Sequence, residues 1–426
     1  SKHLFDDAAT ASQVTFERSS GIAPKALMES ISNRRSRAAT TAAISSIGLS
    51  MPDVEVIKIE PLTGDTYREA VIGGHVWPES EVDWAFILEN RNKRSLSIDL
   101  KSKEGQIIIK KLIQQSDVFI TNLPKTPREK LGLTDIIVRK LNPKIIYASL
   151  TGYGENGPDS NRTALDSTAY FARSGLMDWS KTIDSEGIPP FPIPGGGDHP
   201  TGLSLFTSIL LALMNKEKTG LGTSVSTSLL ANGVWSNAML IQAILSGHKP
   251  IDTFYWETLS AMRNIYTLKD KSLFFMLLTN EEKHWDPFIQ SFNLGFLHNN
   301  TKFNTKDNRQ LNKKELKIIL QEEFIKYTYE EVREKLISIG IVFTKIMKTE
   351  NTIIDPQTNL NNMFMNIEGE DIEKLKLVSP PLNIENAPRK NATKAPKLGE
   401  HNIEILKELG YTMEEIKILQ NNKTIL

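Results

Sequence analysis

The chain has 426 residues, more than one ordinary hydrophobic core holds, so we expect two or three domains. Lysine plus arginine and aspartate plus glutamate number 51 each, which excludes a global charge that would favour nucleic acid or an anionic membrane. Cysteine is absent and the seven histidines lack zinc-type spacing, which excludes disulfides, thiolate metal sites and a cysteine nucleophile; we expect no metal.

The N-terminal segment, residues 1–53, has an unusual composition. Between Arg18 and Pro52 the single acid, Glu29, stands among several arginines and many alanines and serines. This composition is typical of an organellar transit segment, which would place the protein in an organellar matrix. A non-native segment is the other interpretation, and a cytoplasmic location follows from it.

Short β-rich stretches alternate with helical ones between residues 54 and 160. We expect strands at 54–60, 94–100, 117–121 and 144–150, and helices at 103–115 and 127–132. Strands that alternate with helices over short loops form right-handed βαβ units. The sequence therefore predicts an α/β fold with a mainly parallel sheet.

Asp198 stands at the end of a turn that contains three glycines, Gly195–Gly197, and a helical apolar run follows at 203–214. Glycines allow positive φ and a close approach of the backbone to another group. A carboxylate in this position, at a helix N-terminus with unpaired N–H groups, can act as a nucleophile on an acyl group. The alternative is that Asp198 or a neighbour only caps the helix, with Pro200 in its first turn.

The rest of the chain predicts a second, smaller unit followed by a return segment. The apolar run at 203–214 is too short to cross a bilayer, so we expect no membrane partner. Later expectations, in chain order, are a loop at 216–223, a strand at 224–229, a helix at 230–245, a hairpin at 263–278, a helix at 284–292, a solvated loop at 299–314, extended chain near 379–381 and 395–396, and a short helix within 399–411.

From about residue 54 onward, ordered motifs resemble those of the class III CoA-transferases, the CaiB/BaiF-type family that includes formyl-CoA transferase and carnitine CoA-transferase. No single motif is specific, and their order and spacing carry the resemblance. They are Glu55–Pro61, Gly64-Asp65, Asn90–Ser95, Asp99–Lys101, Asp117, Thr121-Asn122, Leu131–Leu133, Thr151–Gly154, Gly157-Pro158, Gly197-Asp198, Lys218–Gly222, Asp355–Gln357 and Ala395–His401.

The resemblance implies an enzyme that moves CoA between an acyl-CoA and a free carboxylate. Asp198 would be the nucleophile and would carry CoA as an aspartyl thioester, with Gly196 and Gly197 forming the approach loop beside the oxyanion. Asp166 would be a second active-site acid, although an ordinary helix cap is an equal alternative. No permanent cofactor is implied, because CoA itself is the substrate.

The same resemblance implies that Asn122 and Leu123 contact CoA and that Lys130 stands near it. Lys93 and Arg94, just before an expected strand, are candidates for its phosphates. A solvated surface pair is the alternative for these two cations, since such charges are mostly exposed.

The resemblance also sets the expected architecture: a large domain with a Rossmann-like, mainly parallel sheet, a smaller α+β domain, and an interlocked homodimer. We expect a divergent N-terminal segment at 1–53, the first part of the CoA-binding domain at 54–220, a linker strand and helix at 221–249, the small domain at 250–345, and a return segment at 346–426. The expected partners are an acyl-CoA, an acid acceptor and a second copy of the chain.

Other functions remain as alternatives to the transferase. The racemase branch of the family has a histidine immediately before the second acid; Leu165 stands there, which removes one of the two bases needed for α-proton exchange. An inactive CoA-binding homologue is suggested by the N-terminus, where a strand at 14–17, a turn at 21–24 and a helix at 25–34 only weakly match the family. A dinucleotide-dependent oxidoreductase is disfavoured because no Gly-x-Gly-x-x-Gly follows a strand. Within the transferases, the stretches 151–159 and 169–175 look closest to branches that handle 2-hydroxy or aryl-substituted acids.

Overall fold

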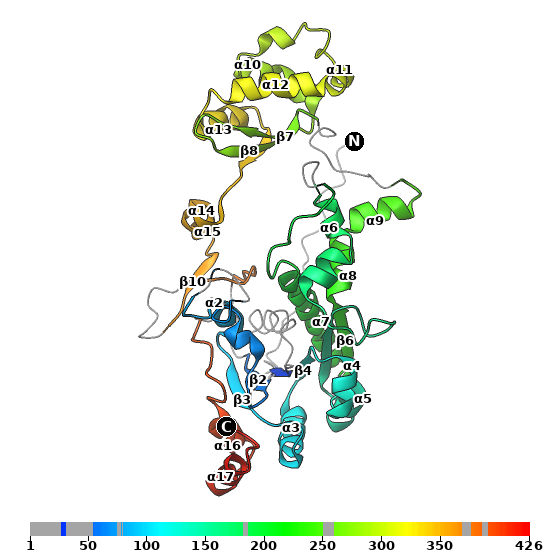
Figure 1. Cartoon of the computed structure of the whole chain (residues 1–426), viewed down its shortest axis with the longest axis vertical. Helices are drawn as coiled ribbons and strands as arrows, with labels where there is room; N and C mark the ends of the chain where they lie inside the picture. Colours follow the sequence, from blue (N-terminus) through cyan, green and yellow to red (C-terminus); the bar gives the residue numbers. More distant parts are fainter. Residues whose placement is uncertain are drawn as a thin grey trace, which may run out of the picture. The chain divides into compact units, whose positions relative to one another are not determined.

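The computed structural model describes residues 54–74, 78, 80–181, 186–249, 260–368, 376–385 and 391–426, together with the backbone of strand β1 (Leu27–Ser30). The chain divides into two compact units. The first comprises residues 1–173, 193–235 and 365–426, and the second comprises residues 174–192 and 236–364. The elements of both are labelled in Figure 1.

The first unit is built on a six-stranded sheet in which every neighbouring pair of strands is parallel. The strand order is β3-β2-β1-β4-β5-β6. The strands that follow β1 are β2 (Val56–Glu60), β3 (Arg94–Ser97), β4 (Val118–Thr121), β5 (Ile146–Thr151) and β6 (Ser224–Ser228). The mainly parallel α/β fold predicted from the sequence is confirmed.

Strand β1 corrects one expectation in the N-terminal segment. The sequence gives residues 25–34 only a weak match to the family's opening helix, whereas Leu27–Ser30 forms a strand between β2 and β4, with Leu27 opposite both Val56 and Val118. A central strand there satisfies backbone groups of both neighbours, which would otherwise lie buried without hydrogen bonds. The strand expected at 14–17 and the turn at 21–24 lie outside the described residues.

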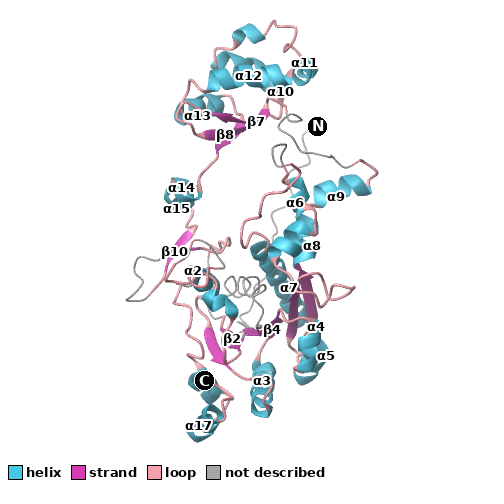
Figure 2. Cartoon of the chain, in the orientation of Figure 1, coloured by secondary structure: helices cyan, strands magenta, loops and turns pink. Residues whose placement is uncertain are grey.

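Two hydrophobic cores cover the two faces of this sheet, because successive side chains of a strand point to opposite faces. On one face, Phe119 and Tyr147 pack with helices α3 (Lys103–Gln115) and α5 (Asp135–Leu141). On the other face, strand residues pack against helix α7 (Asp198–Thr219). Helices therefore flank the sheet on both sides (Figure 2).

The remaining elements of the first unit connect the strands or follow them. Helices α16 and α17 join the core formed by α3 and α5, and the sequence predicts α16 but not α17. The bounds are η1 (Thr66–Glu69), α2 (Trp84–Asn90), α4 (Lys125–Lys130), the π-helical turn η2 (Ser167–Ala172), α8 (Leu229–Ser236), the paired strands β10 (Phe364–Asn366) and β11 (Lys376–Val378), α16 (Asn402–Glu408) and α17 (Met413–Asn421).

Helix α3 allows a direct test of the first unit's stability. The Ser102 hydroxyl caps the helix by accepting the Gly105 N–H at 3.0 Å, and it donates to the Asp99 carbonyl at 2.8 Å. We expect Ser102→Ala to lower the free energy of unfolding by about 1 kcal/mol, because one N–H at the helix start loses its partner. Urea unfolding measures this change. Lys103→Ala, at an exposed neighbour outside the cap, is the matched control and should stay within about 0.5 kcal/mol of the wild type.

The second unit contains a three-stranded antiparallel sheet in the order β7-β8-β9, and the hairpin expected at 263–278 is confirmed. Helices α10, α12 and α13 pack on it around an aromatic core. The bounds are α6 (Leu176–Trp179), α9 (Ala238–Leu245), β7 (Arg263–Thr267), β8 (Leu273–Leu277), α10 (Glu281–Ser291), η4 (Gly295–Leu297), α11 (Lys306–Leu311), α12 (Lys313–Phe324), α13 (Tyr329–Ser338), β9 (Val342–Lys345), α14 (Thr349–Ile354) and α15 (Pro356–Leu360).

Three expectations about loops and helices are wrong. The solvated loop expected at 299–314 contains α11, where the buried guanidinium of Arg309 pairs with Glu281 at 2.8 Å. Helix α7 continues to Thr219 before Gly220, with φ of 72°, ends it. The single helix expected at 230–245 is two helices, α8 and α9, which separate at Asn237.

Candidate active site

The turn before α7 shows why its glycines are needed. Gly195 has a positive φ of 73°, a conformation that side chains other than glycine rarely adopt. Gly197 is the N-cap of α7, with an ordinary φ of −94°, and a glycine has no side chain with which to cap. Asp198 is the first helical residue. Asp198 therefore does not occupy the N-cap position, which its neighbour Gly197 takes.

Glycine is required at position 197 because neighbouring atoms leave no room for a Cβ atom, whereas its backbone angles would suit other residues. A Cβ atom at Gly197 would lie 2.6 Å from Cγ of Tyr170 and 2.9 Å from Cβ of Asp166. A Cβ atom at Gly196 would lie 2.7 Å from Cγ1 and 3.2 Å from the carbonyl oxygen of Ile193, whose side chain is exposed. The start of α7 thus approaches the segment around Asp166 so closely that only glycine fits.

Asp166 connects this segment to the start of α7. One carboxylate oxygen accepts the Ser167 N–H at 2.6 Å and so caps η2, and the other accepts the Gly197 N–H at 3.2 Å. Both alternatives for Asp166 thus have a structural basis, because the same carboxylate caps a helix and holds the residue before Asp198. A π-helical turn such as η2 is frequent at functional sites.

Asp198 is buried, with 7% of its surface exposed, but its surroundings are polar. The next residue, His199, donates from Nε2 to Oε1 of Glu89 at 2.7 Å. Glu89 is buried near the end of α2, whereas the His199 side chain is 55% exposed. The hydrogen bond to Glu89 raises the pKa of His199, and the charges of Glu89, Asp198 and Asp166 raise it further against the effect of burial.

Tyr67 is a further group within electrostatic range of these carboxylates. Burial raises the pKa of Tyr67, and the negative charges of Glu89 and Asp198 raise it further. Sequence reasoning missed both Tyr67 and Glu89. Each lies next to a family motif, Gly64-Asp65 or Asn90–Ser95, but no local pattern links either residue to Asp198 more than 100 positions away.

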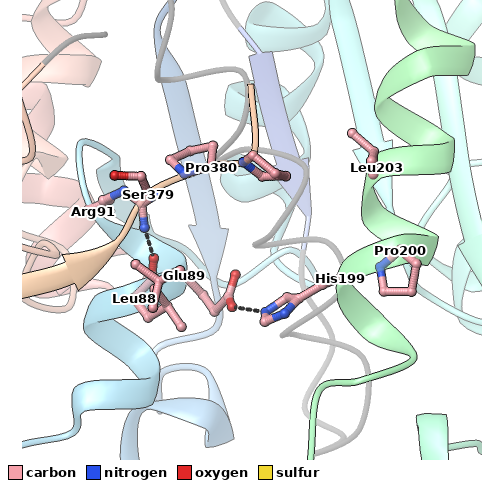
Figure 3. A pocket seen from close by; sticks show the side chains of 10 residues that line it. Leu88, Glu89, Arg91, His199, Pro200, Leu203, Ser379 and Pro380 are labelled. Atoms are coloured by element: carbon pink, nitrogen blue, oxygen red, sulfur yellow. Dashed lines mark hydrogen bonds and ion pairs between the residues drawn. The ribbon is translucent and has the colours of Figure 1, made fainter. Parts of the chain in front are cut away.

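A cavity of about 370 Å³ opens beside the first turns of α7. Figure 3 shows Glu89 of α2 and His199 of α7 pointing toward each other and joined by their hydrogen bond. The described residues that line the cavity are Leu88, Glu89, Arg91, His199, Pro200, Leu203, Val378, Ser379, Pro380 and Pro381.

The residues expected to contact CoA fall into two groups. Asn122 and Leu123 are buried directly after the carboxyl end of β4, and Lys130 is exposed at the end of α4. Lys93 and Arg94 lie instead at the amino end of β3, where Arg94 is opposite Ile57. These two groups, both expected from the sequence to contact CoA, therefore lie at opposite edges of the sheet.

The expectation that Lys93 and Arg94 bind phosphates is not supported. Lys93 is buried and its Nζ donates to Oδ1 of Asn90 at 3.1 Å. The Arg94 guanidinium is 16% exposed and already pairs with Glu404 at 3.1 Å, with Glu408 at 2.9 Å, and with Glu55. The alternative, a solvated surface pair, is also wrong, because both side chains are largely buried.

No group of three or more potential ligand side chains that could hold a metal ion occurs in the described part of the chain. Among the helices with described residues, none combines the length and the hydropathy needed to cross a membrane. The 22-residue α7 is the long helix that carries Asp198, and its last turn contains Lys216 and Lys218.

Over most of its length the chain is similar to proteins that are all described as CoA-transferases. A family model described as CoA-transferase family III matches residues 54–402. The (R)-2-hydroxy-4-methylpentanoate CoA-transferase of Clostridioides difficile is 32% identical over 375 residues, covering 87% of this chain and 92% of the relative. The cinnamoyl-CoA:phenyllactate CoA-transferase of Clostridium sporogenes is 29% identical, covering 87% and 90%. The human succinyl-CoA:glutarate CoA-transferase is 30% identical, covering 83% and 80%.

A solved structure has the same fold. A CaiB/BaiF family protein from Brucella suis superimposes with a TM-score of 0.74 at 24% sequence identity. The match covers 90% of this chain and 98% of that protein. At this identity the similarity shows the fold and not the activity.

Proposed function

The chain belongs to CoA-transferase family III and is an enzyme of that class, and from this premise we propose that it transfers CoA from an acyl-CoA to a free carboxylate through Asp198. The observation that carries the proposal is the position of Asp198 as the first residue of α7, directly after Gly197. N–H groups at a helix start lack partners within the helix and can stabilise an oxyanion.

The proposed reaction has two symmetrical halves. An Asp198 oxygen attacks the carbonyl carbon of the thioester. The C–S bond breaks, CoA leaves as its thiolate, and the acyl group remains on Asp198 as a mixed anhydride. The thiolate then attacks the Asp198 carbonyl carbon, which releases the donor acid and leaves an aspartyl-CoA thioester. In the second half, the acceptor carboxylate attacks the aspartyl thioester, which releases the CoA thiolate and forms a second mixed anhydride. The thiolate then attacks the acyl carbon of the acceptor, which leaves as the new acyl-CoA and frees the Asp198 carboxylate. An ionised aspartate needs no base for this chemistry.

We propose that the first unit binds CoA at the carboxyl ends of its strands. The strand order β3-β2-β1-β4-β5-β6 matches that of doubly wound, Rossmann-like folds, which bind ligands at that edge. Asn122 and Leu123 follow β4 there, and the exposed Lys130 ends the next helix. Arg94 is not carried into the proposal because three glutamates engage its guanidinium.

We propose that the chain forms an interlocked homodimer with a large domain from residues 54–220 and 346–426, a linker at 221–249 and a small domain at 250–345. Exposed apolar side chains on the linker helices α8 and α9 support this proposal, since Trp235 is 79% and Met239 is 87% exposed. Such side chains are expected to be covered by the second copy of the chain. Light scattering on the full chain measures the mass. A cytoplasmic location, or an organellar matrix if residues 1–50 are removed, remains part of the proposal.

The proposed acids are carboxylic acids with an apolar side chain, of the kind named for the two clostridial relatives. A racemase is the alternative, and Leu165 argues against it because no imidazole stands before Asp166. Exchange of the α-proton in deuterated water without CoA transfer would favour the racemase. An inactive homologue would bind CoA without forming an adduct.

Asp166 is proposed as a positioning residue, since its carboxylate holds the Gly197 N–H. We expect Asp166→Asn to lower kcat by about tenfold while the KM for acyl-CoA stays within about threefold, because the start of α7 loses a charged acceptor. Steady-state kinetics measure both constants. A tenfold rise in the KM for acyl-CoA with an unchanged kcat would contradict a positioning role.

The experiment that tests the function is chemical trapping of the adduct. The full chain is incubated with a panel of acyl-CoAs and then treated with hydroxylamine or borohydride. We expect a mass change on the peptide that contains Asp198, since only that side chain would carry the activated group. Modification of a different residue, or transfer without any adduct, would overturn the proposal.

A further inference from the structure

The cavity beside α7 has no role in the steps described so far. Its volume of about 370 Å³ is at the lower end of the range of ~300–1,000 Å³ for small-molecule sites. A small organic acid fits such a volume, whereas the whole of CoA does not. His199, which lines the cavity, directly follows Asp198 in α7.

Most of the described lining is apolar. Hydrocarbon contributed by Leu88, Leu203, Val378 and the prolines would favour a ligand with an apolar side chain, by about fourfold in affinity for each buried CH₂ group. Charged groups occur at two places, Arg91 and the Glu89–His199 pair. The guest is therefore expected to combine an apolar part with a charged group.

The lining charges select an anion. Arg91 is 4% exposed and donates to the carbonyl of Leu88, as drawn in Figure 3, while Glu89 is already hydrogen-bonded to His199. With His199 protonated, the lining carries two cations and one anion. This net positive charge attracts an anion; Arg91 is the buried cation of the pair, and the His199 side chain is half exposed.

Asp198 changes this balance during the proposed reaction. In the free enzyme its carboxylate adds a negative charge next to His199. Once Asp198 carries CoA as a thioester it is uncharged, so the surroundings of His199 become more positive by one charge. The negative charge of Asp166, whose carboxylate also accepts two backbone N–H groups, acts on His199 in both states.

We propose that this cavity is the subsite for the free acid, a monocarboxylate with an apolar side chain, and that His199, held by Glu89, binds its carboxylate when Asp198 is uncharged. The inference rests on the proposed function and adds the place where the acid binds and a specificity-determining residue. The acid then binds most tightly when Asp198 carries CoA as a thioester, which is the enzyme form that the acid must attack. Leu88, Leu203 and the proline segment enclose its side chain.

Binding of 4-methylpentanoate to the full-length Asp198→Asn variant tests the inference without turnover, because asparagine is neutral as the thioester is. Calorimetry should show that Asp198→Asn binds 4-methylpentanoate about tenfold more tightly than the wild type does. The double variant with His199→Gln should bind it at least tenfold more weakly than Asp198→Asn alone. Gln can still donate to Glu89, so the local structure is kept. Equal affinity with and without His199→Gln would overturn the inference.

The pH dependence separates binding by charge from a structural role. Glu89 raises the pKa of His199, so the imidazolium is present below that raised value and is lost as the pH rises through it. Affinity in Asp198→Asn should therefore fall from pH 6.5 to pH 9, and this fall should vanish with His199→Gln. Adding Glu89→Gln should move the fall to lower pH. Tyr67 stays neutral over this range because burial raises its pKa. Burial lowers the pKa of Arg91, but an arginine guanidinium starts from a value far above this range and stays protonated.

Kinetics distinguish the acid from CoA as the occupant. We expect His199→Gln to raise the KM of the acceptor acid at least tenfold, with the KM of acyl-CoA within about threefold of the wild type. Leu203→Phe should weaken 4-methylpentanoate but not acetate, because only the longer acid reaches that wall. A matching rise in the KM of acyl-CoA would assign the cavity to pantetheine. If trapping finds no adduct while acid binding behaves as stated, only the proposed function fails.

Discussion

Asp198→Asn is expected to lower kcat for CoA transfer by at least ~10³-fold, because the amide cannot form the anhydride or the thioester. Asp198 is the first residue of α7 and its helix has a glycine N-cap, so an asparagine of the same shape should leave the fold intact. CoA-transfer kinetics measure the loss. Trapping of the variant with hydroxylamine should yield no modified peptide.

The control for this variant is CoA binding. The affinity for CoA should stay within about threefold of the wild type, because the proposed CoA contacts at Asn122 and Leu123 lie after β4 and not on α7. Undiminished turnover by Asp198→Asn would refute the nucleophile. Loss of CoA binding together with turnover would point to a damaged fold, and the Asp198→Ala variant would then repeat the test.

Gly197→Ala is expected to lower kcat by about 100-fold and the free energy of unfolding by about 1–3 kcal/mol. The added Cβ would overlap Cγ of Tyr170 at 2.6 Å and Cβ of Asp166 at 2.9 Å, so one of these segments must move. Movement of the first turn of α7 displaces the Asp198 carboxylate from the position where it attacks. Kinetics and urea unfolding measure the two effects.

Gly196→Ala is the graded comparison for this prediction. Its Cβ would lie 2.7 Å from Cγ1 and 3.2 Å from the carbonyl oxygen of Ile193, whose side chain is 72% exposed, and neither atom belongs to the segment that contains Asp166. We expect a loss of kcat below about fivefold for this variant. If both variants lose activity equally, the tight contact of Gly197 with Tyr170 and Asp166 is not what places Asp198.

Much of the first unit could be predicted from the sequence, because strands and helices carry their own local patterns. The helix at 103–115 coincides with α3, and all four strands expected between residues 54 and 150 are present. The helix expected at 25–34 failed because a short strand in a sheet centre is specified by its neighbours β2 and β4, which local propensity does not contain. The loop expected at 299–314 failed because the buried Arg309–Glu281 pair orders it.

By itself, the sequence determined the family, the mainly parallel α/β sheet, and Asp198 after its glycines as the candidate nucleophile. Only the tertiary structure decided that Gly197 is there for space, that Glu89 holds His199, and that Arg94 is occupied by glutamates. The physical reason is the range of each interaction. Periodicity and turn chemistry act within a few residues, whereas the Glu89–His199 bond joins residues 110 positions apart and exists only once α2 and α7 have packed into the same unit.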